Sequence, residues 1–445
     1  LSRLMVVMET GEPRQVASTS WALANLRVRD RALLDAIAER CLRRSPRDWD
    51  AMSLSLVPQS FAILHAKDPA LLASISTQMQ QESSTMWQPG DVARLAWAYA
   101  KLLQRDDGVF RDMSCKALSR ISESSPSMLT QTVWAFATVA PPVVTSHFFP
   151  YAVEEMRGSK LADHTPAHLA MVAWSFAAVL FRPVPLLEEI GDAVPLQGDR
   201  LNSQDITMIA WSYATLLAPQ RRVFDFLAGA SMRSLRHFNA QDLSNTAWAF
   251  ATAGEYTPAM MDAIGDEACG RPDDFNCQHI AMLLWAFITL RHGHDRLFEV
   301  IGRLARVDLS SWHSAKLFAY SLAGLPKLRA ELGSREATLR IAAELLSALV
   351  DRLRTGTGEA DDAHTVHDAI FPWLDPALGG SELPNPSLWR EVDSAVLRQR
   401  HRLQELGRSP VFDAVLSAVW SAYDLRIVRD YQCAVQDLGV RGLGS

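Results

Sequence analysis

The chain has few of the features that mark metal-binding, secreted or membrane proteins. Cysteine is scarce, and its five copies form no CxxC pair and stand at no zinc-ligand spacing from histidine. They are Cys41, Cys115, Cys269, Cys277 and Cys433. An odd and scattered set of this kind indicates buried or incidental thiols in a reducing compartment. We therefore expect no metal site built from them.

Long apolar runs and an excess of positive charge are also lacking. The longest apolar stretch, residues 171–181, is far too short to span a bilayer, so no membrane association is expected. The formal net charge is −6, so no global basic field points to a nucleic-acid partner. This balance counts against RNA binding without excluding it, because a basic groove can lie within an acidic chain.

No motif of a common enzyme class is present. The sequence has no GxxxxGK[ST], GxSxG, HExxH or GxGxxG segment. His364 and His367 lie beside Asp361, Asp362 and Asp368, but no further ligand closes a coordination sphere, and a plain polar loop explains them better. We therefore expect no enzyme activity, no cofactor, no metal and no small-molecule substrate.

Tryptophan, in contrast, is abundant, with 13 Trp against 7 Tyr. Seven segments share one pattern of small residues around Trp followed by an apolar residue, as in AWAFATA at 247–253. Their tryptophans are Trp21, Trp97, Trp134, Trp174, Trp211, Trp248 and Trp285. The intervals after Trp97 are 37, 40, 37, 37 and 37 residues. Such self-similarity at a fixed period is typical of repeat proteins.

Two weaker copies extend the array. The 76-residue gap between Trp21 and Trp97 has room for one further copy, SFAILHA, with Phe61 in the place of Trp. Tyr320 in YSLAGL follows Trp285 by 35 residues and marks a ninth copy. The sequence therefore predicts about nine repeats of about 37 residues.

Each repeat is predicted to be a pair of helices. Between Trp248 and Trp285, helix-forming residues predict a first helix over 241–253, with Gly254 as its stop signal. Pro258 suits the first turn of a second helix over 259–268, where apolar residues recur at helical spacing. Nothing alternates with period two. The expected fold is therefore an all-α, right-handed α-solenoid of stacked pairs.

The predicted domain organisation has three parts. The solenoid covers residues 12–354 and ends in a capping helix over 335–354; residues 355–387 form a linker, and residues 388–445 form a small helical C-terminal region. That region carries a basic cluster that could contact phosphates, although the solvated face of a helix is the commoner explanation. The cluster consists of Arg390, Arg398, Arg400, His401 and Arg402.

Positions counted from each Trp separate an apolar set from a polar stripe. The residue five before Trp is apolar in every copy, and small or aromatic residues follow Trp at plus one and plus two. The members at minus five are Val16, Leu56, Val92, Leu129, Leu169, Ile206, Leu243 and Ile280. These positions surround most of the helix, so the Trp row is expected to be a buried ladder and not a set of base-stacking platforms.

One arc of the helix surface is polar, unlike the apolar positions around the rest of the helix. Positions minus seven, minus three and plus four lie close together around the helix, beside Trp, and form one stripe of mostly uncharged polar residues that differ between repeats. Such residues suit modular reading of RNA bases, although an ordinary solvated face is an equally good explanation. The candidate RNA-binding residues are Arg94, Lys101, Gln131, Thr138, Gln204, Thr215, Gln241, Asn245, Thr252, Gln278 and Thr289.

The WAFATxG-type core in helical pairs of this length resembles the octotricopeptide repeat proteins of organelles, over residues 15–330. It is also similar to helical-repeat proteins of dinoflagellates and apicomplexans, and more loosely to subunits of the RNA-editing substrate-binding complex. The resemblance implies RNA binding in a mitochondrion or plastid, for processing, stability, editing or translation. The chain starts at Leu1 and shows no targeting peptide, and its tail lacks the strand-rich signature of the RAP domain that ends many relatives.

Two functions are therefore weighed. The first is binding of single-stranded RNA along the stripe. The alternative is a protein scaffold, in which the same surface holds a helix or peptide of a partner and the acidic balance needs no explanation. An enzyme fused to the repeats would need a catalytic domain in residues 355–445 or in further sequence.

Overall fold

The computed structural model describes residues 11–43, 49–81, 86–157, 161 and 164–307, and in this part it contains sixteen α-helices and no strand. The helices alternate between two classes, which we call first helices and second helices. The first helices are α2 (Pro13–Asn25), α4 (Ala51–Ile63), α6 (Pro89–Lys101), α8 (Pro126–Val139), α10 (Pro166–Ala178), α12 (Ser203–Thr215), α14 (Ala240–Ala253) and α16 (Cys277–Thr289). The second helices are α3 (Arg31–Arg43), α5 (Pro69–Gln81), α7 (Asp107–Ser119), α9 (Pro142–Met156), α11 (Val184–Leu196), α13 (Arg221–Ser234), α15 (Pro258–Gly270) and α17 (Asp295–Val307).

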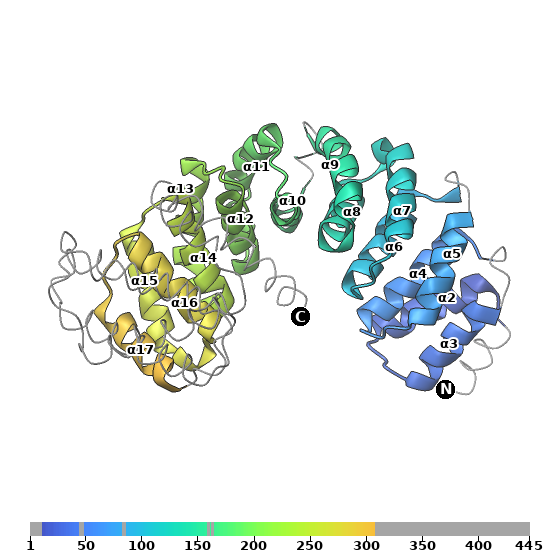
Figure 1. The fold of residues 1–445 in the computed structure, drawn as a ribbon, viewed down its shortest axis with the longest axis horizontal. Helices are drawn as coiled ribbons and strands as arrows, with labels where there is room; N and C mark the ends of the chain where they lie inside the picture. The colour runs from blue at the N-terminus through green and yellow to red at the C-terminus, as the bar shows by residue number, and fades with distance from the viewer. Residues whose placement is uncertain (1–10, 44–48, 82–85, 158–160, 162–163, 308–445) are drawn as a thin grey trace, which may run out of the picture. The chain divides into compact units, whose positions relative to one another are not determined.

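These helices form two compact units that divide between Arg200 and Leu201. Unit 1 contains the pairs from α2 to α11, and unit 2 contains those from α12 to α17 (Figure 1). Within each unit, first helices pack on the first helices of adjacent pairs, and most second helices pack on the second helices of adjacent pairs. The expected all-α fold of stacked pairs is confirmed for this part. The copy at Tyr320, the capping helix, the linker, the C-terminal region and its basic cluster lie outside the described residues.

The repeat predicted from the Trp248 segment is confirmed closely. Its first helix is α14, and it begins where the Asn239 side chain accepts a hydrogen bond from the backbone N–H of Asp242. The Asp242 carboxylate in turn accepts from the Asn239 N–H, which completes a capping box. Asn202 with Asp205 repeats this arrangement at α12. The Asn residues that open these units are therefore helix caps.

The end of the first helix is more regular than the sequence indicates. Seven of the eight first helices end with a left-handed residue six positions after the Trp position. In each of them, the next N–H bonds to the carbonyl at plus two, as Ala218 does to Tyr213 at 3.0 Å, which is a Schellman motif. Glycine occupies the left-handed position once; its occupants are Arg27, His65, Leu103, Leu180, Leu217, Gly254 and Arg291.

The same turn corrects the register of the copy without Trp. His65 is the left-handed residue that ends α4, so the Trp position of this repeat is Gln59 and not Phe61. Phe61 takes position plus two, where the other repeats carry Tyr, Phe or Leu, and it is buried. The minus-five residue is then Leu54 and not Leu56. The prediction was wrong by two residues because it placed the only aromatic residue of α4 on the Trp position.

Two apolar positions contribute to the core of every pair, and a third contributes in five of the eight pairs. The minus-five residues are all buried once Leu54 replaces Leu56, and the plus-two residues are buried in every pair. A third row, ten residues before the Trp position, was missed by the sequence analysis. It closes the gap before the first helix with Trp49, Trp87, Leu201, Phe238 and Phe275, all buried.

The left-handed turns lead to a stability prediction. Leu217 has φ 50° and is 42% exposed, so its side chain adds steric cost to the turn and contributes little packing. We expect Leu217→Gly to raise the free energy of unfolding by about 1 kcal/mol. Gly254→Ala, at the same position of the next repeat, should lower it by a similar amount. Urea unfolding of the full chain measures both changes, and a destabilising Leu217→Gly would contradict this account.

Candidate nucleic-acid interface

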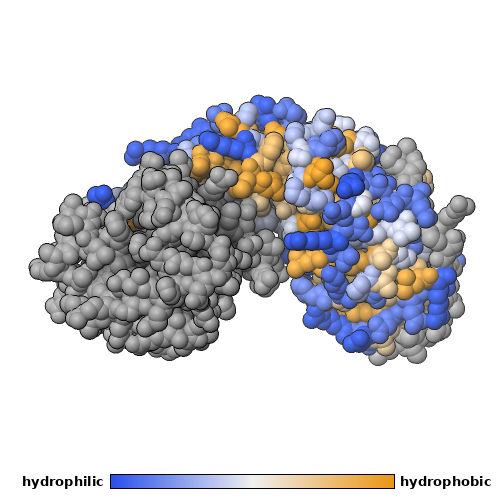
Figure 2. Space-filling view, in the orientation of Figure 1, coloured by the Kyte–Doolittle hydropathy of each residue, from blue (hydrophilic) through white to orange (hydrophobic). Residues whose placement is uncertain are grey.

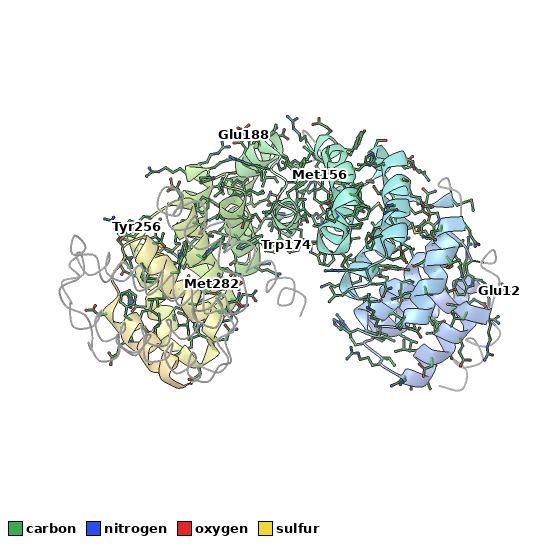
Figure 3. The ribbon with its side chains drawn as sticks, viewed as in Figure 1. Glu12, Met156, Trp174, Glu188, Tyr256 and Met282 are labelled. Atoms are coloured by element: carbon green, nitrogen blue, oxygen red, sulfur yellow. The ribbon has the colours of Figure 1, made fainter. Side chains whose placement is uncertain are left out.

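The plus-two ring shows which way each first helix faces. Tyr99 of α6 contacts Phe110 of α7 with ring centroids 6.3 Å apart, and Phe136 of α8 contacts Phe148 of α9 at 4.7 Å. Because plus two lies on the opposite side of the helix from the Trp position, the Trp side faces away from the second helix of its own pair. Figure 3 shows this for one pair: Trp174 of α10 and Glu188 of α11 lie on opposite sides of the two helices. We call the side that carries the Trp position the free face.

The tryptophans at the Trp position are not all buried, although the sequence predicted a buried ladder. Trp174, Trp248 and Trp285 are at most 9% exposed, as expected. Trp21, however, is 48% exposed. The remaining three, Trp97, Trp134 and Trp211, are half-buried. The Trp position points away from the second helix, so its burial differs with its neighbours, as in the contact between the rings of Trp248 and Trp285.

The predicted stripe lies along the same free face, and most of its residues reach the surface. Gln204 and Thr289 are exposed. The half-buried members are Arg94, Lys101, Gln131, Thr138, Gln241, Asn245, Thr252 and Gln278. Thr215 is only 4% exposed, so the structure does not present it as predicted. The stripe lies to one side of the Trp, and its edge therefore borders the neighbouring first helix, where a small side chain is easily covered.

The amide groups of the stripe are available for a ligand. Among the described residues, none provides a hydrogen-bond partner for the side chain of Gln241 or Asn245. The same holds for Gln131, Gln204 and Gln278. The Thr138 hydroxyl differs, because it donates to the Trp134 carbonyl of its own helix at 2.8 Å and keeps only acceptor capacity.

The cations of the free face lie in unit 1. Arg94 is held by the Asp91 carboxylate and by the Ser55 hydroxyl, whose oxygen is 3.2 Å from Arg94 Nε. Arg14, at minus seven in α2, pairs with Asp50 at 2.7 Å and was not among the predicted residues. Lys101 has its Nζ 5.4 Å from the ring centroid of Trp134 in the next repeat. Lys101 is thus the stripe cation that is held by a ring and not by a carboxylate.

Within the bounds of the first helices, acidic residues are few and buried; the partly exposed Asp50, which pairs with Arg14, precedes α4 as its N-cap. The first helices contain three carboxylates in all, Asp91, Asp205 and Asp242, and each is a buried member of a capping box. Every second helix except α5 carries at least one Asp or Glu, for example Glu188 of α11, which is exposed. Hydrophilic and hydrophobic residues are interspersed over the coloured part of the face drawn in Figure 2. The negative charge of the helices is therefore concentrated away from the stripe.

No family model matches the chain, and no curated protein matches it either. Within the part of the chain that the structure describes, no three His, Cys, Asp or Glu residues come together in a way that could hold a metal ion. Over the same residues, every helix is too short or too polar to cross a bilayer.

Burial shifts the pKa of several groups at the starts of the first helices. Burial lowers the pKa of His279, the third residue of α16, from 6.5 to about 4. The neutral ring accepts a hydrogen bond at Nδ1 from the Asn276 N–H, 3.4 Å away. Burial also raises the pKa of Asp205 and of Asp242, and the N–H of each capping Asn opposes this shift.

His279 gives unit 2 a predictable pH dependence. Its pKa is depressed on folding, so below about pH 6.5 the unfolded chain binds a proton that the folded chain excludes. Stability should therefore fall between pH 7 and pH 4, by up to about 3 kcal/mol for this group. His279→Gln keeps a capping residue and removes the titration.

The measurement is denaturant unfolding of both proteins at each pH. The aspartates act in the opposite sense, since a raised pKa favours folding at low pH, but they are common to both chains and cancel in the comparison. Parallel pH profiles for the two chains would contradict the assignment to His279.

Proposed function

We propose that the free face of the first helices binds single-stranded RNA. The observation that carries the proposal is the absence of surface carboxylates from the first helices in a chain with 50 acidic residues. A polyanion is repelled by exposed carboxylates, and a surface that lacks them can approach phosphates even when the chain as a whole is acidic. The second helices, which carry acidic residues, then form the opposite side.

The side chains of the stripe supply the chemistry for reading bases. Amides such as Gln241 and Asn245 combine a donor and an acceptor and can pair with base edges, while Arg94 and Lys101 suit phosphates. Because the residues change from repeat to repeat at fixed positions, each repeat can favour a different base. In keeping with the resemblance to octotricopeptide repeat proteins, we place the function in organellar RNA processing, stability, editing or translation.

A protein partner is the second candidate, and one feature favours it. Several free-face positions carry methionine, including Met52, which is 54% exposed, and the half-buried Met171 and Met208. Methionine is flexible and adapts to apolar side chains of a partner helix. In that case the face would hold an amphipathic helix.

The first test replaces three stripe residues of α14 together. We expect Gln241→Ala, Asn245→Ala and Thr252→Ala to weaken binding of a preferred RNA by about tenfold or more and to relax its base preference, because several polar contacts are lost at once. Fluorescence anisotropy with labelled oligonucleotides measures both. Thr77→Ala, Gln80→Ala and Gln81→Ala on the second helix α5 form the matched control and should have no effect. Equal affinity and base preference in the α14 variant would contradict the proposal.

A second test asks which partner the chain has in cells. Ultraviolet crosslinking followed by sequencing should recover a defined set of RNA sites, because bases that contact the free face lie within crosslinking distance of its side chains. Recovery of proteins without RNA would overturn the proposal in favour of the scaffold.

A further inference from the structure

Two adjacent repeats of unit 1 place half-buried indole rings and a cation on neighbouring first helices. Trp97 of α6 and Trp134 of α8 are both half-buried. Lys101, one turn after Trp97, has its Nζ 5.4 Å from the ring centroid of Trp134. At this distance the ammonium is attracted by the electron-rich face of the indole, so that face is not covered by apolar packing alone. The half-buried Trp134 ring thus has a lysine ammonium over one of its faces.

Two of the three equivalent tryptophans of unit 2 are buried, whereas Trp211 of α12 is half-buried. Trp248 and Trp285 are 1% and 8% exposed. Their ring centroids lie 6.4 Å apart at an interplanar angle of 33°, so each is packed against the other. The same sequence position is thus buried in α14 and α16 and half-buried in α6 and α8. The position itself does not decide this, since the neighbouring side chains at minus three and plus four differ.

We infer that the surface of α6 and α8 around Trp97, Lys101 and Trp134 is a stacking site for one nucleotide base of the RNA, with Lys101 and Arg94 facing its phosphate. This inference rests on the proposed function and assigns a contact that the stripe alone does not supply. Base–indole stacking is strong and tolerates every base, because each base has an aromatic face. The site therefore adds affinity, whereas the amides of the stripe add selectivity.

Lys101 has a specific part in this site. Its flexible four-carbon stem lets the ammonium leave the Trp134 ring when a base covers it, and the charge then lies close to the incoming phosphate. Arg94 is held by Asp91 and Ser55 and stays in place. The only carboxylate of α6 is this Asp91, with its side chain 6% exposed, and α8 has none, so nothing on these two helices repels the phosphate.

The experiment measures binding of labelled single-stranded oligo(A) and oligo(U) of ten nucleotides to the full chain by fluorescence anisotropy. We expect Trp134→Leu to weaken both oligonucleotides by at least about fivefold and to a similar extent, because stacking is lost whatever the base. Trp134→Phe should retain most of the affinity. Lys101→Ala should weaken binding and reduce the slope of log affinity against log salt by about 0.7.

Controls of the same residue classes lie on second helices. Tyr151→Leu on α9 removes an aromatic side chain that is 57% exposed, and Arg111→Ala on α7 removes an exposed cation. Both should bind as the unmodified chain does. Thermal unfolding of each variant shows whether a loss of affinity comes from loss of the fold, and the recovery by Trp134→Phe separates stacking from packing.

The failures of the two proposals look different. If the unmodified chain binds RNA while folded Trp134→Leu and Lys101→Ala bind equally well, the stacking site is wrong and the proposed function stands. If the unmodified chain binds neither oligonucleotide, both proposals fail. If Trp134→Leu weakens binding of oligo(A) alone, the ring distinguishes between bases and does not stack on every base. That result also overturns this inference.

Discussion

Close packing of the first helices against one another is the constraint on which the rest of each unit depends. Small residues flank the Trp position, as Ala96, Ala98 and Ala100 do in α6, and all three are buried. Side chains of this size let neighbouring helices approach closely, and a single pair could not bury its apolar surface without such a neighbour. The first helices of each unit therefore form a continuous layer, and their remaining arc is shared between repeats as one surface.

This packing also limits where charge can stand. A carboxylate on a closely packed helix is buried, and it is tolerated only where hydrogen bonds satisfy it. Asp205 and Asp242 meet that condition at helix starts, where a capping Asn donates its N–H to the carboxylate. Asp91 of α6 meets it in the same way with Gln88, and the remaining helical carboxylates lie on the second helices. The electrostatic difference between the two sides follows from how the helices stack, and a ligand of either class must meet a face of amides, hydroxyls, methionines and indoles.

The repeat and its two helices could be predicted from the sequence, because period and apolar spacing depend on residues within one repeat. The register of α4 could not, since Gln59 replaces the Trp that marks the other copies. Nor could the exposure of each Trp, which depends on side chains of adjacent repeats: Trp134 is half-buried while Trp248 is buried, although both follow the same local pattern. The burial of Thr215, a predicted stripe residue, also depends on side chains of adjacent repeats and could not be predicted.

The left-handed turn at the end of the first helix sets the length of a repeat. Where the turn is present, successive Trp positions follow at a nearly constant interval, and this includes the Gln59 copy. The one first helix without it is α8, which ends in extended backbone at Ala140 before Pro141, and the next Trp position follows after 40 residues. The second helix of that pair, α9, is also the longest. The turn thus accompanies a constant repeat length, and the longer repeat occurs at α8, the one first helix without the turn.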